Sequence, residues 1–215
     1  MSIIIERFDK IKSNISNTGI KGTKIVAVSK TFTLDHIMPL IQYGHDHFGE
    51  NKVQEAEAKW SEIKKTKTNL KLHMIGKLQS NKAKKAIEVF DYIHSLDNQK
   101  LADNLSKFQI SLNKSVSYFI QVNIGNEVQK SGIPYHEVDA FYNYCTIEKK
   151  MNVIGLMSIP PNDGKTDQYF KSLSELNLSL GLKELSMGMS SDYMKALNYK
   201  ATFLRLGSSI FGDRS

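Results

Sequence analysis

Short apolar runs alternate with longer amphipathic stretches along the whole chain, and this alternation constrains the fold more than any other feature. The apolar runs are rich in β-branched and aromatic residues and end in glycine or small polar residues, as buried strands do. Eight of them are predicted to be strands: residues 24–29, 45–49, 70–76, 91–96, 116–123, 152–158, 182–187 and 202–207. This strand–helix repetition indicates parallel βαβ units.

The intervening stretches carry apolar residues at helical spacing. The predicted helices are residues 33–43, 51–65, 81–89, 97–112, 134–145, 163–180 and 191–199, with an extra N-terminal helix at 3–15. Asp97 is expected to cap the fourth of these helices. Eight units favour an α/β fold of the closed (β/α)8 TIM barrel type over an open Rossmann-like sheet. The open sheet would carry a glycine-rich turn after its first strand, but residues 28–31 read Val-Ser-Lys-Thr.

Length and composition agree with one barrel near the small end of that fold's size range. The chain has 215 residues, 40% of them hydrophobic and 24% charged, and no linker divides it, so we expect a single domain over residues 1–215. One cysteine, Cys145, excludes an internal disulfide and a four-cysteine zinc site and fits a reducing compartment. No apolar stretch approaches the roughly 20 residues of a membrane span. We therefore expect a cytoplasmic protein without a membrane partner or a metal site.

The net charge of +7 comes largely from lysines between Lys59 and Lys85. Three interpretations are open: a solvated helix face, a nucleic-acid surface, or attraction of an anionic small molecule. Glu55, Glu57 and Glu62 are interleaved with the lysines, which favours the solvated face. Arginine, the residue expected for phosphate and base recognition, occurs only three times, which argues against a nucleic-acid partner.

Lys30 stands where a barrel builds its active face, just past the carboxyl end of the first predicted strand. A partly desolvated lysine loses some of its preference for the charged form, and its neutral amine can attack a carbonyl to form a Schiff base. The alternative is a surface lysine that holds its ammonium group in water.

The last two predicted strands supply groups for a phosphate. The loops after strands seven and eight are the usual phosphate site of this fold, and they contain Ser190, Gly207 and Ser208. Gly207 would let backbone N–H groups approach an anion closely. The alternatives are a helix cap at Ser190 and a tight turn at Gly207. A carbonyl-reactive lysine opposite a phosphate cradle describes pyridoxal 5′-phosphate (PLP).

Arg205 alternates with Phe203 on the last predicted strand, where a guanidinium needs a partner. A pyridine nitrogen is one acceptor, and because arginine keeps its proton, that nitrogen would stay unprotonated. The electron sink of the ring would then be weak. A salt bridge with an acidic residue is the alternative.

Seven segments in this order resemble the PLP homeostasis family, the single-domain relatives of the alanine racemase N-terminal barrel. They are residues 27–30, 48–55, 73–82, 122–124 with 130–132, 155–158, 185–190, and 205–208 running to 211–212. The resemblance implies a (β/α)8 barrel and a PLP site made of Lys30, Asn51, Ser190, Arg205, Gly207 and Ser208. In that site Lys30 holds PLP as a Schiff base, Arg205 faces the pyridine nitrogen, Asn51 lies beside the ring, and the remaining three hold the phosphate.

The chain departs from the family pattern after Lys30. Phe32 stands where family members commonly have a second lysine, Thr33 where proline often follows, and Ser158 where threonine is usual. We interpret His73 and Met157 as core or pocket-wall residues.

The resemblance implies an intracellular carrier and buffer of PLP that affects vitamin B6 and amino-acid balance, with no catalytic residues and with PLP-dependent apoenzymes as possible recipients. The alternative is a PLP-dependent amino-acid racemase, which needs acid–base groups on both faces of the substrate carbon. In racemases the opposing tyrosine comes from a second, β-rich domain, which we do not expect here. Tyr135, Tyr193 and Tyr199 could replace it only by coincidence. The lack of that domain favours a monomer. A nucleic-acid or protein-binding module using residues 59–85 ranks last.

Overall fold

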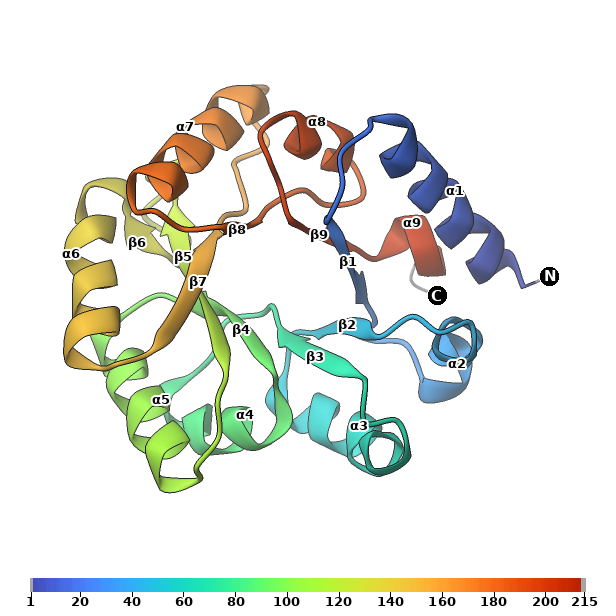
Figure 1. Cartoon of the computed structure of the whole chain (residues 1–215), viewed down its shortest axis with the longest axis horizontal. Coiled ribbons are helices and arrows are strands. Elements are labelled where there is room, and N and C mark those ends of the chain that lie inside the picture. Colours follow the sequence, from blue (N-terminus) through green and yellow to red (C-terminus); the bar gives the residue numbers. More distant parts are fainter. Residues whose placement is uncertain (1, 214–215) are drawn as a thin grey trace.

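Eight parallel strands form a closed barrel in the computed structural model, which describes residues 2–213 (Figure 1). Met1, Arg214 and Ser215, which belong to the predicted domain, lie outside the described residues. The barrel strands are β1 (Lys24–Val28), β2 (His47–Glu50), β3 (Lys71–Met74), β4 (Tyr92–Leu96), β5 (Ser117–Asn123), β7 (Asn152–Met157), β8 (Glu184–Ser186) and β9 (Phe203–Leu206). Pairing of β9 with β1 and of β4 with β5 completes the ring. The predicted (β/α)8 barrel is confirmed.

Helices surround the barrel (Figure 1). They are α1 (Ile3–Asn17), α2 (Leu34–Gln42), α3 (Val53–Thr66), α4 (Ala83–Val89), α5 (Gln99–Ser111), α6 (Val138–Asn143), α7 (Thr166–Ser179), α8 (Tyr193–Asn198) and α9 (Ser208–Phe211). Two short elements were not expected from the sequence: α9, and β6 (Ile133–Pro134), which pairs with the end of β5. Each is too short to show a hydrophobic period of its own.

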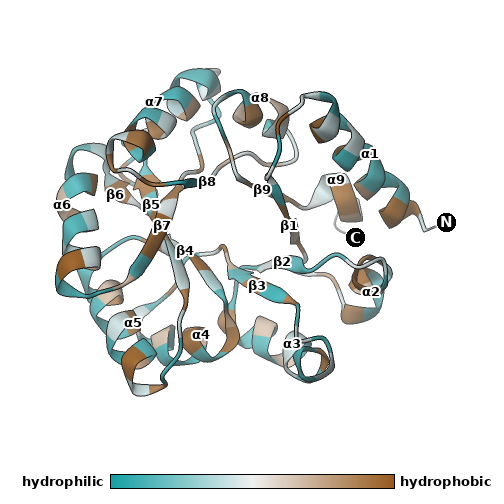
Figure 2. Cartoon of the chain, viewed as in Figure 1, coloured by the Kyte–Doolittle hydropathy of each residue, from teal (hydrophilic) through white to brown (hydrophobic). Residues whose placement is uncertain are grey.

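The N-terminal helix takes a place in the outer ring, as predicted. Its apolar residues recur at helical spacing, and Ile4, Phe8, Ile11 and Ile15 are buried. It lies beside α9, between α8 and α2 (Figure 1). Figure 2 shows hydrophobic and hydrophilic residues interleaved along the ring helices, as expected where one face packs on strands and the other meets solvent.

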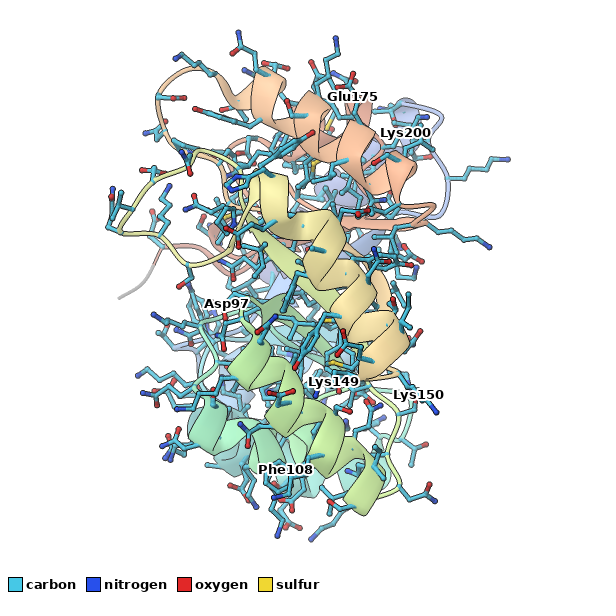
Figure 3. The ribbon with its side chains drawn as sticks, turned by 90° about the vertical axis from the view of Figure 1, so that its left-hand side faces the viewer. Asp97, Phe108, Lys149, Lys150, Glu175 and Lys200 are labelled. Carbon is cyan, nitrogen blue, oxygen red and sulfur yellow. The ribbon has the colours of Figure 1, made fainter. Side chains whose placement is uncertain are left out.

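The outer ring is also joined by polar contacts. The side view in Figure 3 shows α5, α6 and α7 along the outside of the barrel. Lys149, which follows the α6 segment, pairs with Asp103 of α5 at 2.6 Å. Across residues 2–213, no helix combines the length and the apolar character that crossing a membrane requires.

Alternate residues of the strands point into the barrel. Val26, Phe119, Met157 and Phe203 form an apolar cluster there, separate from the larger core between strands and helices. Because Arg205 lies two residues after Phe203, it shares the inward direction. His73 and Met157 are fully buried, in agreement with the core interpretation.

Two local predictions were wrong. The cap of α5 is Asn98, whose side-chain oxygen accepts from the Leu101 N–H at 2.9 Å, rather than Asp97. Lys59 does not belong to a solvated helix face, because its side chain is only 12% exposed and pairs with the buried Glu50 at 2.9 Å. Lys65 on the same helix is 67% exposed, as expected for a solvated face.

Candidate functional site

Five of the six predicted site residues line one cavity of about 320 Å³ at the carboxyl ends of the strands. Barrel closure brings them together, since β9 pairs with β1 with Val26 opposite Arg205 and Ala27 opposite Leu206. The turns that follow these two strands therefore leave the barrel side by side. The cavity is lined by Val28, Lys30, Ile75, Ile159, Met189, Ser190, Ser191, Arg205, Gly207 and Ser208.

Lys30 is half-buried and opens the turn that follows β1. The next residue, Thr31, has φ 72°, a left-handed conformation that is rare for a β-branched residue. Such strain costs on the order of 1–3 kcal/mol and is found mostly at functional sites. Phe32 anchors the turn, stacking on His36 at 4.8 Å and packing on Phe211 of α9 at 5.3 Å between ring centroids. Phe32 is thus a packing residue that ties the Lys30 turn to α9.

Ser190 lies at a point where two backbone N–H groups converge. Its Oγ accepts from the N–H groups of Gly207 and Ser209, each at 3.3 Å, and lies 3.0 Å from Ser209 Oγ. Ser190 does not cap a helix, because α8 begins only at Tyr193 with Asp192 as its cap residue. Converging N–H groups of this kind form an anion-binding concavity.

Gly207 is not fixed by a tight turn. Its φ of −116° lies outside the left-handed region, and a Cβ there would meet Val28 at 3.5 Å, an ordinary contact. The conformation that would demand glycine at a turn is therefore absent at this position. Gly207 lines the cavity, where its N–H donates to Ser190 Oγ.

Arg205 is held inside the barrel by two serines. It is 4% exposed, and it donates from Nη1 to Ser186 Oγ at 2.6 Å and from Nη2 to the Ser158 carbonyl at 2.9 Å. Burial lowers the pKa of Arg205 to about 10, while the charge of Asp192 opposes this shift. Within the described chain its hydrogen-bond partners are neutral oxygens, so the salt-bridge interpretation is wrong. Arginine has five N–H donors, and two are used here.

Asn51 lines a neighbouring cavity of about 410 Å³, together with Met74 and Lys77, rather than the cavity that holds Lys30. Its Oδ1 is buried and accepts no hydrogen bond from the described residues. The backbone of Asn51 lies against Gly76, where a Cβ would overlap the Asn51 carbonyl. A position beside the ring stays a prediction for this residue.

Sequence reasoning missed a buried hydrogen-bond network around Glu50 that supports the strand end carrying Lys30. Oε1 of the buried Glu50 accepts from Ser29 Oγ at 2.7 Å, Lys59 Nζ at 2.9 Å and Trp60 Nε1 at 3.0 Å. Ser29 directly precedes Lys30, so this network fixes the end of β1. Glu50 lies in the segment 48–55 that resembles the family. Its contact with Lys59 was missed because a separation of nine residues matches no simple period of a strand or helix.

The barrel and its cluster of lysine, arginine and converging amides define the class to which the chain belongs. Residues 4–215 match the sequence model of the family described as alanine racemase, N-terminal domain. A protein of Aquifex aeolicus named pyridoxal phosphate homeostasis protein is 34% identical over 223 residues, covering 100% of this chain and 96% of the relative. The chain therefore belongs to the pyridoxal phosphate homeostasis family, within the alanine racemase N-terminal domain class, as the sequence segments indicated.

Two solved structures resemble this chain, one in sequence and fold and the other in fold alone. PipY of Synechococcus elongatus PCC7942, solved with PLP bound, is 34% identical with a TM-score of 0.86 and covers 97% of this chain and 100% of PipY. An alanine racemase of Bartonella henselae is 14% identical with a TM-score of 0.74, covering 99% of this chain but 60% of the racemase. The racemase similarity shows a shared barrel fold.

Proposed function

We propose that this protein binds PLP covalently on Lys30 and acts as a carrier and buffer of PLP in the cytoplasm. The observation that carries the proposal is the meeting of Lys30, Ser190, Arg205, Gly207 and Ser208 in one cavity. These residues come from three separate parts of the sequence, and each has the chemistry that one part of PLP requires. The naming of the Aquifex relative and the PLP-bound PipY structure support the same function.

The cavity suits PLP in size and in polarity. About 320 Å³ lies within the range of small-molecule sites. The N–H groups of Gly207 and Ser209 with the hydroxyls of Ser190 and Ser208 would hold the phosphate. Arg205 would present a donor to the pyridine nitrogen. When bound, PLP supplies an aldehyde whose carbon joins the Lys30 nitrogen with release of one water.

A carrier role suits this cavity better than racemisation. Among the described residues, no tyrosine lines the cavity, although racemisation requires acid–base groups on both faces of the substrate carbon. Tyr193 instead accepts from Asn14 at 3.1 Å, and Tyr199 donates to Asp167 at 3.2 Å. The proposal includes a monomeric single-domain protein that passes PLP to apoenzymes.

The proposal is tested by loading the protein with PLP and recording its absorbance before and after borohydride reduction. We expect a visible band that reduction abolishes, and a pyridoxyl mass located on Lys30. Lys30→Ala should lose both signals. Lys183→Ala removes an exposed lysine ahead of β8 and is the matched control, which should keep both.

Absence of the band and of an adduct on Lys30 in the wild-type protein would refute PLP binding. Turnover of amino acids by the loaded protein would refute the carrier assignment and restore the racemase alternative. Transfer of PLP to a PLP-dependent apoenzyme, faster than from free solution at the same concentration, is the result expected of a carrier.

A further inference from the structure

Three histidines form a continuous hydrogen-bonded row across the inside of the barrel. His47 Nδ1 lies 2.8 Å from His73 Nε2, and His73 Nδ1 lies 2.9 Å from His94 Nε2. The row continues from His94 Nδ1 to Ser186 Oγ at 2.9 Å, and Ser186 Oγ accepts from Arg205 Nη1 at 2.6 Å. Every link is within ordinary hydrogen-bond distance, and five strands (β2, β3, β4, β8 and β9) contribute one side chain each.

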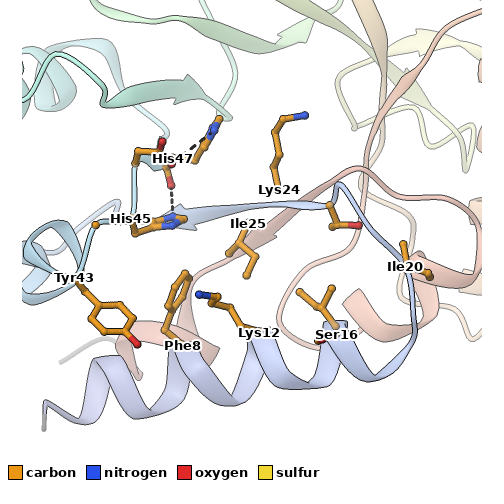
Figure 4. A pocket seen from close by; sticks show the side chains of 13 residues that line it. Phe8, Lys12, Ser16, Ile20, Lys24, Ile25, Tyr43, His45 and His47 are labelled. Atoms are coloured by element: carbon orange, nitrogen blue, oxygen red, sulfur yellow. Dashed lines mark hydrogen bonds and ion pairs between the residues drawn. The ribbon is translucent and has the colours of Figure 1, made fainter.

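The row joins the two ends of the barrel. At one end, His47 lines a cavity of about 420 Å³ between α1 and the starts of β1 and β2 (Figure 4). At the other end, Arg205 lines the cavity that contains Lys30. Figure 4 shows His47 beside His45, whose Nε2 lies 2.8 Å from the His47 carbonyl oxygen.

Stacking holds the two inner rings in place. His73 lies parallel to the Tyr92 ring at 4.3 Å with an angle of 6° between the planes. His94 stacks on Phe119 at 4.3 Å with an angle of 24°. Both histidines are completely buried, so the neighbouring hydrogen bonds must satisfy their ring nitrogens.

The charge of Arg205 sets a direction along the row. Arginine only donates, so Ser186 Oγ is an acceptor in that link, and its own proton is available to His94 Nδ1. A neutral imidazole has one donor and one acceptor, so His94 then donates from Nε2 to His73, and His73 donates from Nε2 to His47. The reverse order would direct the His94 proton toward Ser186 and the guanidinium beyond it. Burial and, after it, the charge of Arg205 lower the pKa of His94. The same positive charge disfavours an N–H of His94 that points toward it, so the first order is favoured.

Burial, rather than the surrounding charges, favours the neutral form of the row. Burial lowers the pKa of His73 and His94 well below the ordinary value, and it also lowers that of His47. Further charges act on His47: those of Asp46 and Asp91 raise its pKa, and those of Lys24 and Lys71 lower it. Around His73, the charges of His94, His47, His45 and Lys24 all lower its pKa in addition to burial.

Acid would act on this row from the His47 end. The His47 side chain is 17% exposed and its Nε2 lies 3.9 Å from Asp46 Oδ1, whereas the two inner histidines have no exposure. A protonated His47 would donate from both ring nitrogens and could no longer accept from His73. Either that link would break or all links would reverse, and reversal would make His94 a second donor to Ser186.

We propose that His47, His73, His94 and Ser186 form a relay that positions Arg205 toward the cofactor site and makes this positioning respond to protonation of His47 at the opposite end of the barrel. These four are positioning residues, since they act through Arg205. The effect on PLP rests on the proposed function, whereas the ordering of the row is a property of the protein without PLP.

The ordering is tested by ¹⁵N NMR of the full chain labelled at histidine, without PLP. We expect His47, His73 and His94 to be neutral tautomers with the proton on Nε2. Ser186→Ala removes the proton donor of His94, and the tautomer signals of all three rings should shift. In His136→Gln, which changes an exposed histidine outside the row, they should stay as in the wild type. A shift confined to His94 would overturn the relay.

The coupling is tested on PLP-loaded protein by following the cofactor absorbance from about pH 7.5 down to pH 5, a range that covers the ordinary histidine pKa and the lower values to which burial moves that of His47. His47→Gln keeps an acceptor for His73 but does not titrate, and it should lose the pH-dependent part of the spectrum seen in the wild type and in His136→Gln. An unchanged pH profile in a His47→Gln protein that still binds PLP would refute the coupling alone. Failure of the wild type to bind PLP would refute the proposed function instead, and the NMR experiment would then decide the relay.

Discussion

Replacing Lys59 by methionine should destabilise this protein far more than the same change at other lysines of α3. Lys59 Nζ donates to Glu50 Oε1 at 2.9 Å and to the Ser29 carbonyl at 2.9 Å. Glu50 is fully buried, and Lys59 is the cation paired with it. Lys59→Met leaves a buried carboxylate without its countercharge.

Breaking a buried ion pair by removal of one partner typically costs about 3–5 kcal/mol. Ser29 Oγ and Trp60 Nε1 would still donate to Glu50 Oε1, so we expect the lower part of that range, about 3 kcal/mol. In a chain of this size, 1 kcal/mol lowers Tm by roughly 2–4 °C, which gives a decrease of about 6–12 °C.

Thermal and urea unfolding measure the effect, with Lys65→Met as the matched control on the same helix. Lys65 pairs with Glu62 at 2.7 Å, but the two side chains are 67% and 85% exposed, so its loss should cost less than about 1 kcal/mol. The double variant Glu50→Gln/Lys59→Met removes both charges and should recover at least half of the loss. Equal costs for Lys59→Met and Lys65→Met would refute the buried-pair reasoning.

Three further predictions concern the thiol, the pH dependence and the phosphate cradle. Burial raises the pKa of Cys145 to about 12, so a thiol reagent at pH 8 should label native protein far more slowly than unfolded protein; equal rates would contradict its buried position. Burial lowers the pKa of His45 to about 4 from an unfolded value near 6.5, so the folded state binds fewer protons in this window. Stability should therefore be lost as pH falls from about 6.5 toward 4, by about 3 kcal/mol from this residue, and urea unfolding of His45→Gln should show a shallower loss. Gly207→Ala should keep nearly wild-type stability, because its Cβ meets Val28 only at an ordinary contact distance, but that Cβ would stand in the cavity that both residues line. We expect PLP to bind about tenfold more weakly, which corresponds to one lost hydrogen bond to a charged group, and unchanged affinity would refute the cradle. Gly76→Ala should instead lose stability, because its Cβ overlaps the Asn51 carbonyl.

The order of strands and helices could be predicted because each element is determined largely by its own residues. Apolar runs of strand length and amphipathic stretches of helical length each depend on a few neighbouring residues. The predictions that failed depended on a choice between neighbouring cap residues or on a tertiary contact. Asn98 rather than Asp97 caps α5, and β6 exists only because Ile133 pairs with Val122 of β5.

The site was predictable in its chemistry and less so in its geometry. Lys30, Arg205 and the glycine–serine turn could be selected because their side chains or backbone fit an aldehyde, a ring nitrogen and a phosphate. The partners of Arg205 could not be chosen in this way, since Ser158 and Ser186 are ordinary residues until the barrel closes around them. Asn51 was assigned by resemblance, and the structure places it in the adjoining cavity.

The sequence by itself determined the repeated strand–helix units, the inward alternation of Phe203 with Arg205, and the residue types available for binding PLP. Only the tertiary structure decided which of them meet. Closure pairs β9 with β1, so the turn at Lys30 lies beside the turn at Gly207, although Lys30 and Gly207 are far apart in the chain. Parallel pairing of β2, β3 and β4 aligns His47, His73 and His94 into one row, and packing of α3 on β2 places Lys59 against Glu50. These contacts depend on strand register around the whole barrel, which no short segment of sequence contains.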